Sequence, residues 1–300
     1  MIQRKKITMD GNEAAAHVSY AYSDVAAIYP ITPSSPMPEH IDEWASHNRK
    51  NVFGNPVQVT EMQSEAGAAG AVHGSLVAGA LTSTYTASQG LLLMIPDMFK
   101  IAGERLPGVF HVAARSISTC SINMYGDHQD VMTAVPTGFA MLVSGSVQEI
   151  MDLAPVAHMA AIRANIPFVH FFDGFRTSHE VQKIEVWDYK DLGEMLDFEA
   201  VANFKNRSLS PERPTMRGTF EKAGYFQRTE AQNIAYDKLP EIVEESLAKV
   251  NEKLGTNYGL FNYVGAPDAT DIIVVMGSGS DTTQETVEYL NKQGKKVGVV

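Results

Sequence analysis

Short apolar runs alternate with longer segments in which small and apolar residues recur at helical spacing along roughly the first 185 residues. Short apolar runs bounded by Gly or Pro predict buried strands, and the longer period predicts helices. The expected strands are residues 26–29, 56–60, 82–86, 108–113, 139–143 and 167–172. The expected helices are residues 13–24, 65–80, 90–103 and 147–163. This alternation predicts a doubly wound α/β domain with a mainly parallel sheet covered on both faces.

The pattern changes between residues 187 and 263, which are more polar, richer in aromatic residues and poorly periodic. Pro211, Pro214 and Gly218 interrupt this stretch, and residues 240–254 predict one helix. The aromatic residues are too numerous for a disordered linker. We therefore expect an irregular excursion, residues 187–263, that packs over the first domain.

The last 30 residues return to the first pattern. Their expected elements are a strand at 272–276, a helix at 281–293 and a strand at 296–300. Two strands and one helix bury too little apolar surface to be stable alone, and the last strand would leave an apolar edge open. We expect a domain at residues 1–260, followed at 264–300 by the truncated start of a second α/β domain in a longer polypeptide.

The composition is that of an ordinary globular protein, with 44% hydrophobic and 20% charged residues. A formal net charge of −11, against one short basic run at residues 4–6, excludes nucleic acid and anionic membranes as expected partners. No apolar run approaches the roughly 20 residues of a membrane helix, and no signal peptide is evident, so we expect a cytoplasmic protein. Cys120 is the only cysteine, so this chain cannot hold an iron–sulfur cluster with a cysteine quartet.

Three polar residues stand at or just beyond the ends of expected strands. Thr32 lies in a loop where Pro30, Pro33, Pro36 and Pro38 break the pattern. Glu65 opens an expected helix, and Arg115 follows the strand at 108–113. Open α/β sheets bind ligands at the carboxyl ends of their strands, and a guanidinium fork suits a carboxylate. A hydroxyl, a carboxylate and a guanidinium together would suit a site that acts on a 2-oxoacid.

Each of these residues also has a purely structural interpretation. A carboxylate that bonds the aminopyrimidine of thiamine diphosphate activates that cofactor, and Glu65 fits this role if Ser64 caps the helix. An acid in a first turn can instead simply complement the helix dipole. Residues 66–70 carry no side chain larger than methyl, which suits close approach by a ligand or by another helix. Arg115 could form a surface salt bridge, and Thr32 could be a turn residue.

Asp127, His128 and Asp130 could ligate a metal, although close spacing on a loop that starts with glycine more often reflects local capping. We predict no metal site in this chain from them. Residues 277–280 follow a strand and could cradle phosphate, but they lack the third glycine of a dinucleotide fingerprint.

Five longer stretches carry a resemblance to a known family. They are residues 28–35, 61–74, 86–96, 126–130 and 170–180. From Asp10 to Val300 the chain closely resembles the N-terminal region of the pyruvate:ferredoxin (or flavodoxin) oxidoreductases. The resemblance implies a pyrimidine-side thiamine domain to about residue 260 and the start of a transketolase-C-like domain after it.

The resemblance also implies roles for the three candidates. Thr32 and Arg115 would bind the substrate, and Glu65 would engage the aminopyrimidine of thiamine diphosphate. The implied reaction decarboxylates pyruvate on the cofactor, passes electrons through 4Fe-4S clusters to ferredoxin or flavodoxin, and transfers the acetyl group to coenzyme A. A homodimer is the expected assembly.

The chain lacks two features of that family. It has no Gly-Asp-Gly motif for the diphosphate and Mg²⁺, and it has no cysteine runs for clusters. We expect the remainder of the same polypeptide to supply both, so the 300 residues alone should be inactive. One alternative is a ferredoxin oxidoreductase for another 2-oxoacid, such as 2-oxoglutarate. Another is a non-catalytic α/β subunit that binds partners through residues 187–263.

Overall fold

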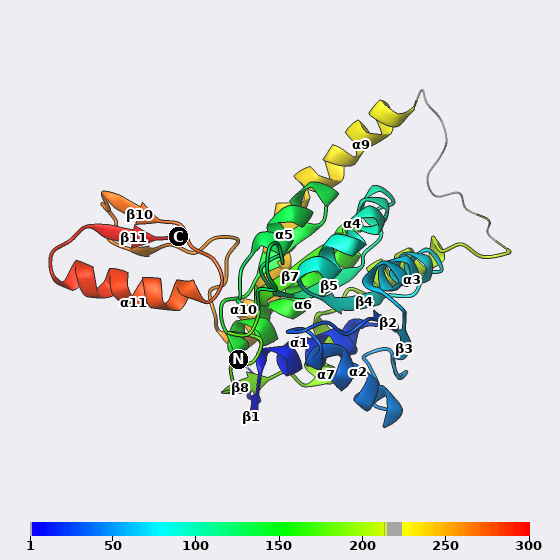
Figure 1. The fold of residues 1–300 in the computed structure, drawn as a ribbon, viewed down its shortest axis with the longest axis horizontal. Coiled ribbons are helices and arrows are strands. Elements are labelled where there is room, and N and C mark those ends of the chain that lie inside the picture. Colours follow the sequence, from blue (N-terminus) through cyan, green and yellow to red (C-terminus); the bar gives the residue numbers. More distant parts are fainter. Residues whose placement is uncertain (1, 213, 215–223) are drawn as a thin grey trace.

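A six-stranded, fully parallel sheet forms the centre of the computed structural model, which describes residues 2–212, 214 and 224–300 (Figure 1). The strand order is β3-β2-β4-β5-β7-β6. The strands are β2 (Val25–Ile28), β3 (Gln58–Glu61), β4 (Thr82–Thr86), β5 (Val109–Ala114), β6 (Ala140–Val143) and β7 (Phe168–Asp173). All six strands were expected, with bounds that differ by at most two residues.

Helices cover both faces of this sheet, as the doubly wound prediction requires. They are α1 (Gly11–Tyr22), α2 (Pro36–Ser46), α3 (Glu65–Val77), α4 (Ser88–Gly103), α5 (Gln129–Ala134) and α6 (Val147–Ala164). The connections from β2 to β3 and from β6 to β7 run in one direction across the sheet. The connections from β3 to β4 through α3 and from β4 to β5 through α4 run in the opposite direction. Right-handed crossovers therefore place α2 and α6 on one face and α3 and α4 on the opposite face. Helix α1 packs against α2 and α6, and α5 packs against α4.

The core lies on both sides of the central strands. Every residue of β4 and β5 is buried, because helices cover both faces of these strands. Phe110 on β5 packs edge-on against Phe139, with ring centroids 4.9 Å apart. No helix among the described residues is long and apolar enough to cross a membrane.

Two loops that we expected contain the start of a helix. Pro36 and Pro38 do not prolong the loop but lie in the first turn of α2, where the missing N–H of proline costs no hydrogen bond. Gln129 and Asp130 open the short helix α5. The antiparallel pair β1 (Lys5–Met9) and β8 (Gln182–Val186) was also missed, because these strands are short and partly charged.

The stretch from 187 to 263 is more regular than we expected. It contains α7 (Tyr189–Met195), α8 (Phe198–Asn206), α9 (Tyr225–Asp237) and α10 (Leu239–Leu254), the last of which confirms the predicted helix. Helices α8 and α10 pack against α6. Residues 213 and 215–223, Gly218 among them, lie outside the described residues.

Residues 264–300, which we call the C-terminal segment, form a separate small sheet beside the large one (Figure 1). Its strands are β9 (Val264–Gly265), β10 (Asp271–Ile273) and β11 (Val297–Val299), with β10 and β11 parallel. Helix α11 (Gly279–Lys292) connects β10 to β11. The expected strand, helix and strand are confirmed, although both strands are shorter than predicted and β9 was missed.

Candidate functional site

The topology marks one place on the sheet where loops diverge. The chain leaves β2 toward β3 on one side, whereas β4 adjoins β2 on the other side. In open α/β sheets, ligands bind outside the carboxyl ends of the strands at such a switch point. Thr32 lies in the loop after β2, Glu65 opens α3 after β3, and Ser88 to Gly90 open α4 after β4.

Arg115 follows β5 directly and reaches across the end of β4 toward the loop after β2. Its Nη1 donates to the Thr32 carbonyl at 2.9 Å, and its Nε donates to the Asn123 carbonyl at 2.9 Å. It makes no ion pair with any described residue, so the salt-bridge interpretation is wrong. A guanidinium has five N–H donors, so three remain for a ligand. Two of the three candidates thus lie together, although their strands are not neighbours.

Several contacts fix the loop that carries Thr32. Asn12 on α1 donates its Nδ2 to the Pro33 carbonyl at 3.0 Å. Gly174 follows β7, and a Cβ there would lie 2.6 Å from the Ala114 carbonyl oxygen and 2.7 Å from Pro33 Cγ. Only glycine permits this approach, which brings together the loops after β2, β5 and β7. Thr32 itself is exposed, and none of the described residues bonds its hydroxyl.

Ser64 caps α3, as the thiamine interpretation of Glu65 requires. The Ser64 Oγ accepts from the Gly67 N–H at 3.2 Å, which places Glu65 in the first turn. The Glu65 residue is only 7% exposed, and its carboxylate accepts no hydrogen bond from a described residue. The carboxylate therefore keeps its acceptor capacity for a donor from outside the described residues, and complementing the helix dipole does not use that capacity.

Gly90 on α4 borders the Glu65 carboxylate. A Cβ at Gly90 would lie 2.8 Å from Glu65 Oε1 and 2.6 Å from Thr86 Oγ1. The Thr86 hydroxyl is buried and has no hydrogen-bond partner in the described part of the chain. A carboxylate, an unpaired hydroxyl and a side-chain-free backbone therefore meet at one point, which fits the polar edge of an aminopyrimidine. Thr86 was not among the site residues predicted from the sequence. Its place at the end of a buried strand could have drawn attention to its hydroxyl.

The small residues of α3 serve two different faces. Ala68 and Ala69 are fully buried, as packing within the protein predicts. Ala66 and Gly70 are exposed, and a Cβ added at Gly70 would meet no atom within 4 Å. Packing within this chain therefore explains the small size of Ala68 and Ala69. It does not explain the small size of Ala66 and Gly70.

The acids of residues 126–130 act as caps. The Asp127 carboxylate accepts from the Gln129 N–H at 2.9 Å, and Asp130 likewise accepts from backbone N–H groups. Among the described residues, no three His, Cys, Asp or Glu side chains are placed to hold a metal ion. The local capping interpretation is confirmed for Asp127, whereas Asp130 bonds mainly backbone N–H groups of distant segments, Ser88 and Arg115.

His128 belongs instead to a polar joint between the large sheet and the C-terminal segment. Its Nε2 lies 2.5 Å from Oδ1 of Asp173, at the end of β7. The Asp173 carboxylate also accepts from the backbone N–H of Ser278 at 2.9 Å and from the Ser278 hydroxyl. The hydrogen bond to Asp173 raises the pKa of His128, and burial only partly opposes it. Burial raises the pKa of Asp173, but the bonds from His128 and Ser278 outweigh it, so this pKa is lowered.

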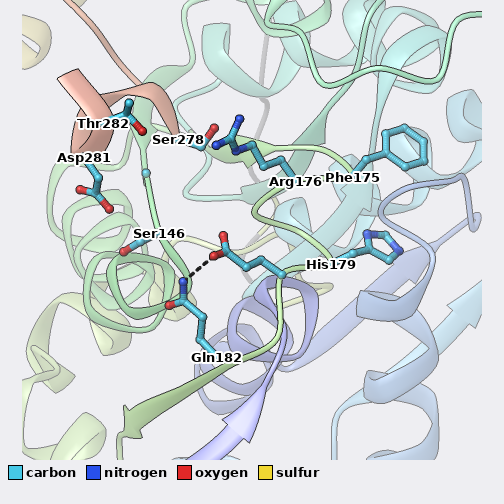
Figure 2. Close-up of a pocket in the computed structure, with 10 residues that line it drawn as sticks. Ser146, Phe175, Arg176, His179, Gln182, Ser278, Asp281 and Thr282 are labelled. Carbon is cyan, nitrogen blue, oxygen red and sulfur yellow. Dashed lines mark hydrogen bonds between the residues drawn. The ribbon is translucent and has the colours of Figure 1, made fainter. Parts of the chain in front are cut away.

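A cavity of about 370 Å³ lies next to this joint, and none of the three candidate residues lines it (Figure 2). Its walls are the loops after β6 and β7 and the first turn of α11. Arg176 and Asp281 contribute opposite charges from facing sides. Gln182 donates to Glu180 at 2.8 Å on the remaining wall. The cavity is therefore a second recess at the same edge of the sheet.

Comparisons with known proteins identify the family of the chain. Residues 17–247 match the model of the family described as pyruvate flavodoxin/ferredoxin oxidoreductase, thiamine diphosphate-binding. The chain is 60% identical over 297 residues to the pyruvate-flavodoxin oxidoreductase of Enterobacter agglomerans and 62% identical over 296 residues to the pyruvate:ferredoxin oxidoreductase of Moorella thermoacetica. These matches cover 99% and 98% of this chain. In both cases the chain spans only 25% of the relative's length.

A solved structure shares the fold at low sequence identity. It is a 2-oxoglutarate:ferredoxin oxidoreductase from Magnetococcus marinus with 2-oxoglutarate, coenzyme A and succinyl-CoA bound. The TM-score is 0.71 at 17% identity, and the match covers 99% of this chain and 53% of that one. At this identity the likeness supports the fold alone.

Proposed function

This chain belongs to the pyruvate flavodoxin/ferredoxin oxidoreductase family, and we propose that Thr32, Glu65 and Arg115 form the pyrimidine side of its thiamine diphosphate site. One observation carries the proposal. Glu65 is buried at the switch point of the sheet beside a glycine and an unpaired threonine hydroxyl, and no described residue donates to its carboxylate. Thiamine diphosphate would supply a donor for this carboxylate, the N1′–H that its aminopyrimidine ring carries in the imino tautomer.

Each residue has a distinct task in this proposal. When bound, thiamine diphosphate supplies the nucleophilic carbon and the electron sink for decarboxylation of a 2-oxoacid. Glu65 would accept a hydrogen bond from N1′–H of the aminopyrimidine ring and so favour the imino tautomer, which can take the proton from the thiazolium carbon. Arg115 binds the substrate carboxylate with the donors that Thr32 and Asn123 leave free. Thr32 donates its exposed hydroxyl to the substrate from a loop that loses little entropy on binding.

The complete enzyme would convert pyruvate and coenzyme A to acetyl-CoA and CO₂ and pass the electrons to ferredoxin or flavodoxin. The Mg²⁺ ligands and the 4Fe-4S clusters would come from outside these 300 residues, which contain a single cysteine. The chain alone would therefore be inactive. We retain the division into domains at 1–260 and 264–300, the homodimer and the cytoplasmic location as parts of this proposal.

Pyruvate is the favoured substrate because the relatives that are 60% and 62% identical are named for it. Turnover of pyruvate against 2-oxoglutarate by the complete enzyme distinguishes this substrate from the alternative 2-oxoacid.

Replacing Glu65 by Gln in the complete enzyme tests the proposed site. Glutamine keeps the size of the side chain but is a weaker acceptor and cannot take part in proton transfer. Pyruvate-dependent reduction of a viologen dye should fall by roughly 10²- to 10⁴-fold, the usual contribution of a positioned acid or base. Calorimetric titration of thiamine diphosphate should show that the variant still binds the cofactor.

Glu61→Gln is the matched control, because Glu61 is an exposed carboxylate only four residues away at the end of β3. Its dye reduction should equal that of the unmodified enzyme. Near-normal activity of Glu65→Gln would reject the proposed site and favour the non-catalytic alternative.

A further inference from the structure

Asp130 is buried at the carboxyl end of the large sheet, between the loops that follow β4 and β5. Its exposed fraction is 0%, although it is an acid on a short helix beside an exposed loop. A buried carboxylate persists only where several donors compensate for its lost hydration. Three backbone N–H groups meet this requirement.

These donors come from three different segments. The Asp130 Oδ2 accepts from the Ser88 N–H at 2.7 Å and from the Arg115 N–H at 3.0 Å. The Oδ1 accepts from the Val131 N–H at 2.7 Å. One carboxylate oxygen therefore ties the start of α4 to the residue that follows β5.

On the α4 side, Asp130 replaces a missing helix cap. The N-cap position of α4 is Ala87, whose side chain cannot accept a hydrogen bond. Ser88 adopts a left-handed backbone with φ +51°, which is uncommon for a residue with a side chain. The bond from its N–H to Asp130 stabilises this turn, and two residues later Gly90 borders Glu65.

On the β5 side, Asp130 holds the backbone of Arg115 and not its guanidinium. The guanidinium is steered separately by the carbonyls of Thr32 and Asn123. The arginine is thus held at its backbone and at its guanidinium, and no acid in the described part of the chain neutralises its charge. An arginine held in this way keeps its charge and its remaining donors for an incoming carboxylate.

We propose that Asp130 is a positioning residue that sets Arg115 for the substrate carboxylate. This inference rests on the proposed function, because it assumes that Arg115 binds the substrate. Burial raises the pKa of Asp130 to about 6, with the backbone bonds and His128 opposing it, so the acceptor form predominates at neutral pH. The geometry favours this form, since both oxygens accept from backbone N–H groups and an ionised carboxylate is the stronger acceptor at each.

The test is the kinetics of Asp130→Asn in the complete, cofactor-loaded enzyme. An amide accepts at one end only, so in either orientation its NH₂ group faces at least one of the three backbone N–H donors. That donor–donor contact displaces the side chain and weakens its hold on the backbone of Arg115. The KM for pyruvate should rise by about tenfold, the loss expected for one misplaced charged contact, and the rate at saturating pyruvate should fall less than that. Asp127→Asn is the matched control: it removes the charge of a nearby exposed cap and should leave both constants unchanged.

A purely structural role for Asp130 would reduce the amount of active enzyme, lowering the saturating rate at constant KM, and that result would overturn the inference. Unchanged kinetics would overturn it as well. If Asp130→Asn does not yield folded enzyme, Asp130→Glu, which keeps the charge but displaces it, takes its place with the same expected rise in KM.

Arg115→Lys separates this inference from the proposed function. If Arg115→Lys raises the KM and the Asp130 variant does not, only the positioning role fails. If Arg115→Lys leaves the KM unchanged, the substrate role of Arg115 fails and the role of Asp130 fails with it.

Discussion

The large sheet and the C-terminal segment are built from the same strand–helix–strand unit, but they bury it very differently. All six residues of β5 are buried, whereas all three residues of β10 are exposed. Helix α6 buries most of its length, whereas α11 buries only Val287. This unit therefore forms a core only where layers cover both faces of the sheet, and among the described residues the large sheet alone has such layers.

The contacts at the joint between the two regions are polar, whereas those in the core of the large sheet are apolar. A Cβ at Gly277 would lie 2.7 Å from Asp173 Oδ1, and one at Gly145 would lie 2.8 Å from the Gly277 carbonyl oxygen. Two glycines thus let the segment approach Asp173, whose carboxylate bonds His128 and Ser278. We expect apolar packing to control the stability of the large sheet and ionisation to control the joint.

The largest effect should come from a paired truncation in the two regions. Phe110→Ala in β5 should lower the free energy of unfolding by about 3–5 kcal/mol, because it leaves a cavity in a fully buried core. Ile273→Ala in β10 should change it by less than about 0.5 kcal/mol, because Ile273 is 50% exposed. Urea unfolding of the 300-residue chain measures both. Equal decreases in the free energy of unfolding would show that β10 is covered in solution. The two regions would then not differ in burial as the structure indicates.

Acid should weaken the large sheet through three buried histidines. His111 lies 3.0 Å from His170 between their Nδ1 atoms and 3.1 Å from His158 between their Nε2 atoms. Burial lowers the pKa values of His158 and His170 to about 3. For His158, the nearby His170 lowers the pKa further. In the unfolded chain the same imidazoles titrate near 6.5. The unfolded state therefore binds more protons below pH 6.5, and stability falls as the pH drops from there toward 3.

The expected slope is about 1.4 kcal/mol per pH unit for each histidine that stays neutral in the folded state. Urea unfolding at successive pH values measures it. His158→Gln should reduce the slope, and His47→Gln, at an exposed position, should not. A flat profile between pH 6.5 and 5 would contradict the predicted burial of neutral imidazoles.

The smallest effect concerns the joint and has the opposite dependence on pH. The raised pKa of His128 means that its contribution is complete below about pH 6.5 and is lost as the pH rises through the folded value. Asp173→Asn should weaken the joint by about 1–3 kcal/mol at neutral pH, because Ser278 and His128 lose a charged acceptor. The hydrogen-exchange protection factors of residues 277–282 should therefore fall in the variant, and in the unmodified chain as the pH rises through the raised pKa of His128.

Hydrogen exchange in β5 is the internal control, since it should not respond to Asp173→Asn. If residues 277–282 have equal protection factors in both proteins, the segment is held by contacts other than this joint.

Local patterns predicted much of the fold and part of the site. Residues 82–86 were predicted with the observed bounds, because a strand buried on both faces appears as a short uniform run between breaks. The cap at Ser64 followed from the position of a serine before a helix with an acid in its first turn. Prolines misled the prediction at α2, because the same residue that breaks a helix interior is well tolerated in its first turn.

By itself, the sequence determined the parallel α/β sheet, the order of its elements and the position of Thr32, Glu65 and Arg115 at strand ends, because these depend on periodicity and spacing along the chain. Only the tertiary structure decided that Arg115 reaches the Thr32 carbonyl, that Gly90 borders Glu65, and that Asp130 ties two loops together. Those contacts join residues up to 83 positions apart. Their partners are largely backbone atoms, which every residue carries, so no pattern of side chains along the chain could have revealed them.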